Sequence, residues 1–131
     1  MPVISALDRE RGFLVSRASG NVLTTEIVAA LEGITGETRG GSLYKPHLFL
    51  IDGAASVDEV SFEGLLKLRD ANERWSSLFP DRRTKTAVVV CKTEHLAAAK
   101  IWQAVAEANP LVRVQVAIFT EQAQAERWLA T

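Results

Sequence analysis

The sequence predicts an α/β protein with a single mixed, mostly parallel sheet of four to five strands and with helices packed against it. Two short β-rich runs near the N-terminus are separated by a polar segment that ends in Gly12, as in a hairpin. From residue 47 onward, strand-like runs alternate with amphipathic helical segments, and this alternation requires parallel strands joined by right-handed crossovers. Residues 85–91 (KTAVVVC) are uninterrupted and β-branched at their centre, which is typical of a strand covered on both faces.

The N-terminal part of the predicted β-β-α-β-α-β-α-β-α order contains the hairpin, one helix and one strand. The hairpin strands are expected at residues 3–7 and 13–17. The helix has a cap at Thr24 or Thr25 and ends at Gly33 and Gly36, and its apolar residues recur at helical spacing: Ile27, Val28, Leu31 and Ile34. A glycine-rich loop over residues 36–45 then leads through Pro46 into an apolar strand at residues 47–52.

The C-terminal part alternates helices and strands. Ser61 is expected to cap a helix that runs to about residue 79, where Pro80 prevents continuation, with an inward stripe of Leu65, Leu68, Ala71, Trp75 and Leu78. The strand at residues 85–91 leads to a helix that is expected to begin with a cap at Thr93 and to end at Asn109-Pro110. The expected apolar face of this helix consists of Ala98, Ile101, Trp102 and Val105. A strand within residues 112–119 follows, and Thr120 is expected to cap a last helix with Ala125, Trp128 and Leu129.

Composition narrows the classes of function. The sequence shows neither a repeat nor a linker, so a single domain over residues 1–131 is predicted. A formal net charge of −1 provides no attraction to nucleic acid. Cys91 is the single cysteine and cannot form an internal disulfide, which indicates a reducing compartment. No apolar run approaches the roughly 20 residues that span a bilayer, and the N-terminus does not read as a signal peptide, so we expect a soluble cytoplasmic protein without integral membrane association.

Four segments carry a resemblance to a known family: HLFLIDGA (47–54), SFEGLLKL (61–68), KTAVVVC (85–91) and VQVAIFTEQAQAERWL (114–129). In this order they resemble the STAS-type domains, and within them the SpoIIAA-like group related to sporulation anti-sigma-factor antagonists. The resemblance covers nearly the whole chain. It implies a STAS-like sheet of four or five strands with helices packed against it. It also implies non-catalytic roles, either protein–protein switching or the holding of a small or lipid-like ligand.

The same resemblance draws attention to Ser61. In signalling STAS proteins an Asp-Ser pair begins the second helix, and a partner kinase phosphorylates that serine. Here Ser61 follows Val60, and Gly64 lies one residue further on than in that pattern, so the match to the phosphorylation motif is incomplete. The favoured interpretation of Ser61 is structural, as the N-cap of a helix. The functional alternative is that Ser61 accepts a phosphate at the N-terminus of this helix.

Asp52 and Cys91 are the other residues with candidate chemistry. Asp52 ends a strand and is best explained as a turn residue, with a role as an acid, base or ligand anchor as the alternative. Cys91 precedes a helix, and His95 follows it by four residues, but a phosphatase-type Cys-x5-Arg loop would need arginine where this chain has Ala97. A buried, inert cysteine is therefore favoured over a nucleophile.

No cofactor or metal is expected from the sequence. His47 and His95 are the only histidines, neither has metal-site spacing to other ligands, and both are expected at the surface or at a cap. The glycines at positions 36, 40 and 41 lead from a helix into a strand, whereas a phosphate-binding loop leads from a strand into a helix.

The leading hypothesis is a non-enzymatic, STAS-like regulatory or interaction module that acts through protein–protein contacts. The alternatives are a carrier or binding domain for a small apolar or lipid-like ligand, and a thiol-dependent enzyme that uses Cys91. An alanine-rich flank on the third helix (Ala97, Ala104 and Ala108) suggests a homodimer. The binding or regulatory surface is expected where the parallel strands end, at Asp52, Gly53, Ser61, Cys91, Thr93 and Thr120.

Overall fold

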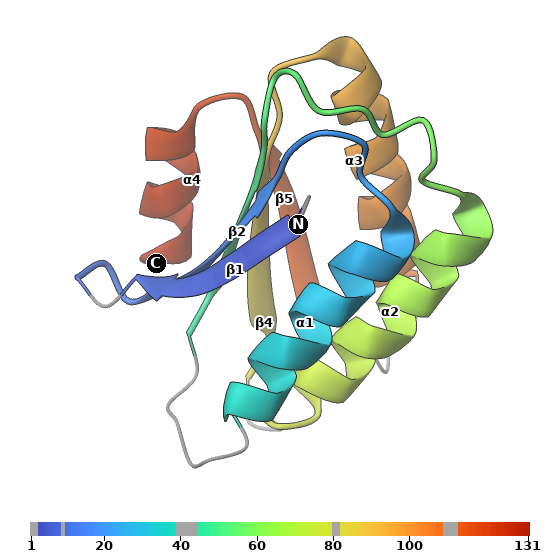
Figure 1. The fold of residues 1–131 in the computed structure, drawn as a ribbon. Helices are drawn as coiled ribbons and strands as arrows, with labels where there is room; N and C mark the ends of the chain where they lie inside the picture. The colour runs from blue at the N-terminus through green and yellow to red at the C-terminus, as the bar shows by residue number, and fades with distance from the viewer. Residues whose placement is uncertain (1–2, 9, 39–44, 80–81, 109–112) are drawn as a thin grey trace.

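Five strands form one mixed sheet in the computed structural model, which describes residues 3–8, 10–38, 45–79, 82–108 and 113–131 (Figure 1). The strands lie across the sheet in sequence order: β1 (Val3–Asp8), β2 (Phe13–Ala18), β3 (His47–Ile51), β4 (Thr84–Val89) and β5 (Val114–Phe119). β1 is antiparallel to β2, and each later pair is parallel. The predicted fold class, an α/β protein with a mixed and mostly parallel sheet, is therefore confirmed.

The helices cover both faces of the sheet, but unequally. Helices α1 (Thr24–Thr38), α2 (Phe62–Ser76) and α3 (Thr93–Glu107) lie on one face, whereas α4 (Gln122–Leu129) lies alone on the other (Figure 1). Each of α1, α2 and α3 connects two neighbouring parallel strands, and right-handed crossovers between strands that follow one another in this order place all three on the same side.

Alternation along β3 divides the apolar residues into two cores. Leu48 and Leu50 face α4 and pack with Ala87, Ala125 and Leu129. On the opposite side, Phe49 belongs to the larger core beneath α1, α2 and α3, which also contains Trp75 and Trp102. A strand with both faces covered must be apolar at consecutive positions, and this explains the HLFLI run.

Helices α1 and α2 approach each other closely near their first turns. A Cβ atom built on Gly64 would lie 2.6 Å from Oγ1 of Thr24 and 2.7 Å from both Cβ and Cγ2 of the same residue. Thr24 is buried at this point. Glycine at position 64 therefore permits a helix–helix contact that any larger residue would obstruct.

Several predicted helix ends are wrong. Helix α1 continues through Gly33 and Gly36 to Thr38, and its packing against α2 offsets the poor helix propensity of glycine. Thr93 is the first residue of α3 rather than its cap; the N-caps of α3 and α4 are Lys92 and Glu121, and neither side chain makes a capping hydrogen bond. Pro80, Asn109, Pro110 and most of the loop predicted at 36–45 lie outside the described residues, as does the side chain of Ile34.

The buried face of α3 also differs from the prediction. Ile101 is 50% exposed, and the buried residues of the helix are His95, Ala99, Trp102, Val105 and Ala106. This face includes more small residues than the predicted one because α3 packs closely over β5. Ala97, Ala104 and Ala108 are exposed.

Candidate functional site

The edge of the sheet where the parallel strands end carries most of the predicted site residues. Asp52 follows β3, Cys91 follows β4 and Thr120 follows β5, so β4 separates the first from the last. Gly53 and Cys91 are brought together: Sγ of Cys91 lies 3.1 Å from the position of a Cβ built on Gly53. Ser61 is at the far end of the loop over residues 52–61, and Thr93 and Thr120 are exposed.

Cys91 and His95 do not have the environments that the sequence suggested. Cys91 is exposed just beyond β4, so the expectation of a buried cysteine is wrong. His95 is fully buried, and its Nε2 donates a hydrogen bond to the carbonyl oxygen of Ala55 at 2.7 Å. The surface or cap position expected for His95 is wrong because residue 95 shares a buried helical face with Ala99, Trp102 and Ala106. The imidazole therefore holds the loop over residues 52–61 against α3.

The same loop is fixed at further points. Asp52 accepts a hydrogen bond from the backbone N–H of Ala54 at 2.9 Å, which confirms its interpretation as a turn residue. The backbone of Ser56 bonds to Gly20 at 2.8 Å and to Val22 at 2.9 Å, which ties the loop to the segment that precedes α1. These hydrogen bonds, together with the one from His95, hold the loop over residues 52–61 in one conformation at the edge of the sheet.

Ser61 ends the loop as the N-cap of α2. Its hydroxyl accepts a hydrogen bond from the backbone N–H of Gly64 at 3.0 Å, which confirms the predicted cap.

We expect Ser61→Ala to lower the free energy of unfolding by about 1 kcal/mol, measured by urea titration. Thr93→Ala is the control, because Thr93 is exposed at a helix start but is not an N-cap; it should change stability by less than about 0.5 kcal/mol. Equal losses for the two variants would contradict the capping role.

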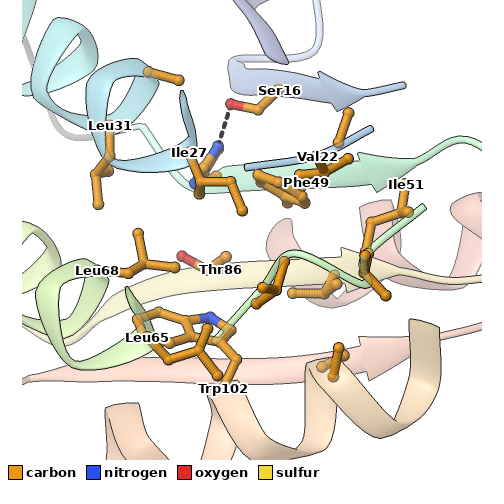
Figure 2. Close-up of a pocket in the computed structure, with 18 of the residues that line it drawn as sticks. Ser16, Val22, Ile27, Leu31, Phe49, Ile51, Leu65, Leu68, Thr86 and Trp102 are labelled. Carbon is orange, nitrogen blue, oxygen red and sulfur yellow. Dashed lines mark hydrogen bonds between the residues drawn. The ribbon is translucent and has the colours of Figure 1, made fainter. Parts of the chain in front are cut away.

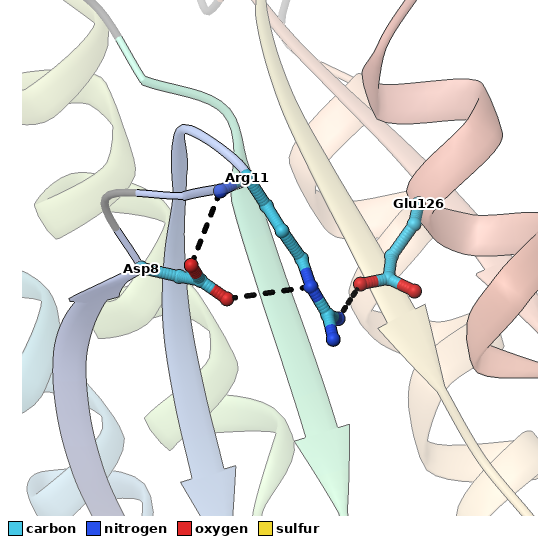
Figure 3. A network of polar contacts seen from close by, with 3 residues as sticks. All are labelled: Asp8, Arg11 and Glu126. Atoms are coloured by element: carbon cyan, nitrogen blue, oxygen red, sulfur yellow. Dashed lines mark hydrogen bonds and ion pairs between the residues drawn. The ribbon is translucent and has the colours of Figure 1, made fainter.

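A cavity lies beneath this loop, between the sheet and helices α1, α2 and α3 (Figure 2). Its volume is about 70 Å³. Strands β2, β3 and β4 form its floor, the three helices form its walls, and Val57 and Val60 of the loop also line it. Nearly all the lining groups are apolar, including Phe49, Leu68 and Trp102.

The few polar lining groups are Ser16, His47, Asn72 and Thr86. The Oγ atom of Ser16 lies 2.7 Å from Nε2 of His47 and 2.7 Å from Oγ of Ser5, which forms a short chain of hydrogen bonds. Asn72 donates from Nδ2 to a backbone carbonyl one turn earlier in α2 at 3.3 Å. The buried hydroxyl of Thr86 has no hydrogen-bond partner among the described residues.

The cavity is electrically neutral near pH 7. Burial lowers the pKa of His47 from 6.5 to about 4, because the imidazolium would lose its hydration in the interior. Among the described residues that line the cavity there is no Asp, Glu, Lys or Arg. His47 is buried, so the surface or cap position expected for it is wrong; it lies on the inner face of β3.

The site predicted from the sequence lies only at the edge of the sheet, and the cavity was not predicted. The available signal was weak: a polar residue stands on the inner face of each of three adjacent strands, at Ser16, His47 and Thr86. Polar residues in otherwise apolar strands are rarely buried without a partner, and only the packing of three helices shows that these positions face one cavity.

Two further findings concern the part of the chain that the structure describes. No three of its His, Cys, Asp and Glu residues are grouped so that they could hold a metal ion. None of its helices combines the length and the apolar character needed to cross a membrane.

The described site is a mostly apolar cavity between the sheet and helices α1, α2 and α3. Comparison of the chain with models of protein families, with curated proteins and with solved structures gave no match. Function is therefore inferred from the geometry of the chain itself.

Proposed function

We propose that this protein is a non-catalytic binding module that holds a small, mostly apolar molecule in the cavity between the sheet and helices α1, α2 and α3. The observation that carries the proposal is the cavity of about 70 Å³ with almost entirely apolar walls. Protein interiors are close-packed, and voids larger than a water molecule are few. This volume admits about five or six water-sized groups, and mostly apolar walls favour small apolar molecules.

The position of the cavity fits a binding role. It extends from the middle of the sheet to the edge where the parallel strands end, and the loop over residues 52–61 covers it there. Val57 and Val60 of this loop are only partly buried, so the cavity comes nearest to solvent beneath them. Binding sites in α/β proteins are commonly found at this edge of the sheet.

The test is the stabilisation of the protein by benzene, a small apolar probe. A ligand that binds only the folded state raises the free energy of unfolding as its concentration exceeds the dissociation constant. We expect millimolar benzene to raise the urea midpoint of the natural protein. Ala98→Met, which lengthens a side chain that lines the cavity, should remove this effect.

Ala97→Met is the matched control, because Ala97 is the neighbouring residue of the same helix but is exposed and does not line the cavity. Its response to benzene should equal that of the natural protein. Absence of stabilisation by benzene in both the natural protein and Ala97→Met would refute the proposal. Equal stabilisation of Ala98→Met would also do so, because binding would then occur elsewhere.

A second candidate function is regulatory protein contact, as the resemblance to STAS-type domains implies. It is supported by the start of α2, where Ser61 is exposed and the adjacent Phe62 is 62% exposed. An exposed aromatic residue beside a serine that a kinase can reach is suited to a phosphorylation-dependent contact. Peptide mass spectrometry of the protein from its native host tests this: phosphate on Ser61 supports the switch, and an unmodified Ser61 in all growth phases contradicts it.

A further inference from the structure

We infer that the molecule held in the cavity carries one uncharged oxygen, as a hydroxyl or a carbonyl group, and that the hydroxyl of Thr86 is its hydrogen-bond partner. This inference rests on the proposed binding function and names the chemical class of the ligand.

The hydroxyl of Thr86 has no partner within the described structure. Thr86 is 4% exposed, its Oγ1 is buried, and it lies on the floor of the cavity. Figure 2 shows Thr86 rising from β4 into the space beside Leu65, Leu68 and Trp102. A buried hydroxyl without a partner reduces the folding equilibrium constant by about tenfold, and valine would fill the same space without that cost. A ligand that supplies the missing hydrogen bond explains why threonine is present.

Each of the other polar side chains that line the cavity already makes at least one hydrogen bond. Ser16 and His47 bond to each other at 2.7 Å, and the amide nitrogen of Asn72 donates to its own helix. Thr86 is the cross-strand partner of His47 in the parallel pair β3–β4, so the oxygen of a ligand bound to Thr86 would lie at the polar end of the cavity. The apolar remainder of the ligand would extend along Phe49 and Ile51 toward the loop over residues 52–61.

The charge of the ligand follows from the neutral walls. A carboxylate or an ammonium group in this cavity would be buried without a counter-ion, because no charged side chain is among the described lining residues. Burial of an unpaired charge is far more costly than burial of a neutral hydrogen-bonded group. Fatty acids and amines are therefore disfavoured, and small alcohols, phenols, ketones and esters are preferred.

The removal of the hydroxyl has an expected effect on the unliganded protein. We expect Thr86→Val to increase the folding equilibrium constant by about tenfold in urea titrations, because the variant keeps the shape of the side chain and loses the unsatisfied polar atom. A decrease of the same size would show that the hydroxyl has a partner in the folded protein and would overturn the inference.

Phenol and toluene, which have nearly the same shape, test recognition of the ligand. Their dissociation constants are measured by NMR titration for the natural protein and for Thr86→Val. We expect the ratio of the toluene to the phenol dissociation constant to fall by about tenfold in Thr86→Val, the value of one buried hydrogen bond. Thr86→Ser, which keeps the hydroxyl, should restore most of the ratio.

The outcomes separate the inference from the proposed function. If phenol and toluene both bind but the ratio changes by less than about twofold in Thr86→Val, the cavity binds ligands without the help of Thr86 and the inference is wrong. If benzoate or benzylammonium binds as tightly as phenol, the requirement for a neutral ligand is wrong. If neither phenol nor toluene binds, the proposed function itself fails.

Discussion

Gly64→Ala is expected to lower the free energy of unfolding by about 2 kcal/mol. The added Cβ would lie 2.6–2.7 Å from three side-chain atoms of Thr24, which is closer than real Cβ contacts. Thr24 is buried at the start of α1 and has little room to move, so the two helices must separate. The better helix propensity of alanine offsets about 1 kcal/mol of the strain and is included in the expected value.

Gly33→Ala is the matched control. Gly33 also lies within a helix, but a Cβ built on it meets nothing within 4 Å. This substitution should raise the free energy of unfolding by about 0.5–1 kcal/mol, because alanine loses less backbone freedom on folding. Urea titration of the two variants measures both effects. Stabilisation by both substitutions would show that α1 and α2 do not approach as closely as described.

Acidification from pH 7 to pH 4 is expected to lower the free energy of unfolding by about 3 kcal/mol through His47 alone. Burial lowers the pKa of His47 from 6.5 to about 4. Between these two values the unfolded chain binds a proton that the folded protein does not, so stability falls as the pH falls. The loss begins near pH 6.5 and is complete below about pH 4, where both states are protonated.

The substitution His47→Gln isolates this contribution. Glutamine does not titrate, and its amide can still bond to the hydroxyl of Ser16. Urea titrations at pH 7, 5.5 and 4 should show a smaller loss of stability for His47→Gln than for the natural protein, by about 3 kcal/mol over the whole range. Parallel losses in the two proteins would contradict the burial of an uncharged His47.

The fold was largely predictable from the sequence because each element has a local signal. The apolar run at residues 47–52 indicated a strand, and Ser61 indicated the start of a helix; both predictions are confirmed. The caps expected at Thr93 and Thr120 were wrong because hydroxyl residues near a helix start are common, and only backbone geometry shows which residue is the N-cap.

The candidate site was predicted less well because it depends on contacts between distant segments. His47 and His95 were expected at the surface or at a cap, since a histidine in one sequence does not show whether a partner is available in the interior. Their partners, Ser16 and the carbonyl group of Ala55, are 31 and 40 residues away. The cavity is lined by residues of three helices and three strands that are far apart in the sequence. Its presence and its volume therefore cannot be predicted from any local sequence pattern.

The central claim is that the space beneath α1, α2 and α3 accepts a small uncharged molecule. It is tested most directly by nuclear Overhauser effects between toluene protons and protein methyl groups. The account predicts effects to Leu65, Leu68 and Val88, which line the cavity, and none to Leu48 and Leu129, which belong to the core beneath α4. Effects to the second group alone, or none at concentrations of toluene near saturation, would contradict it.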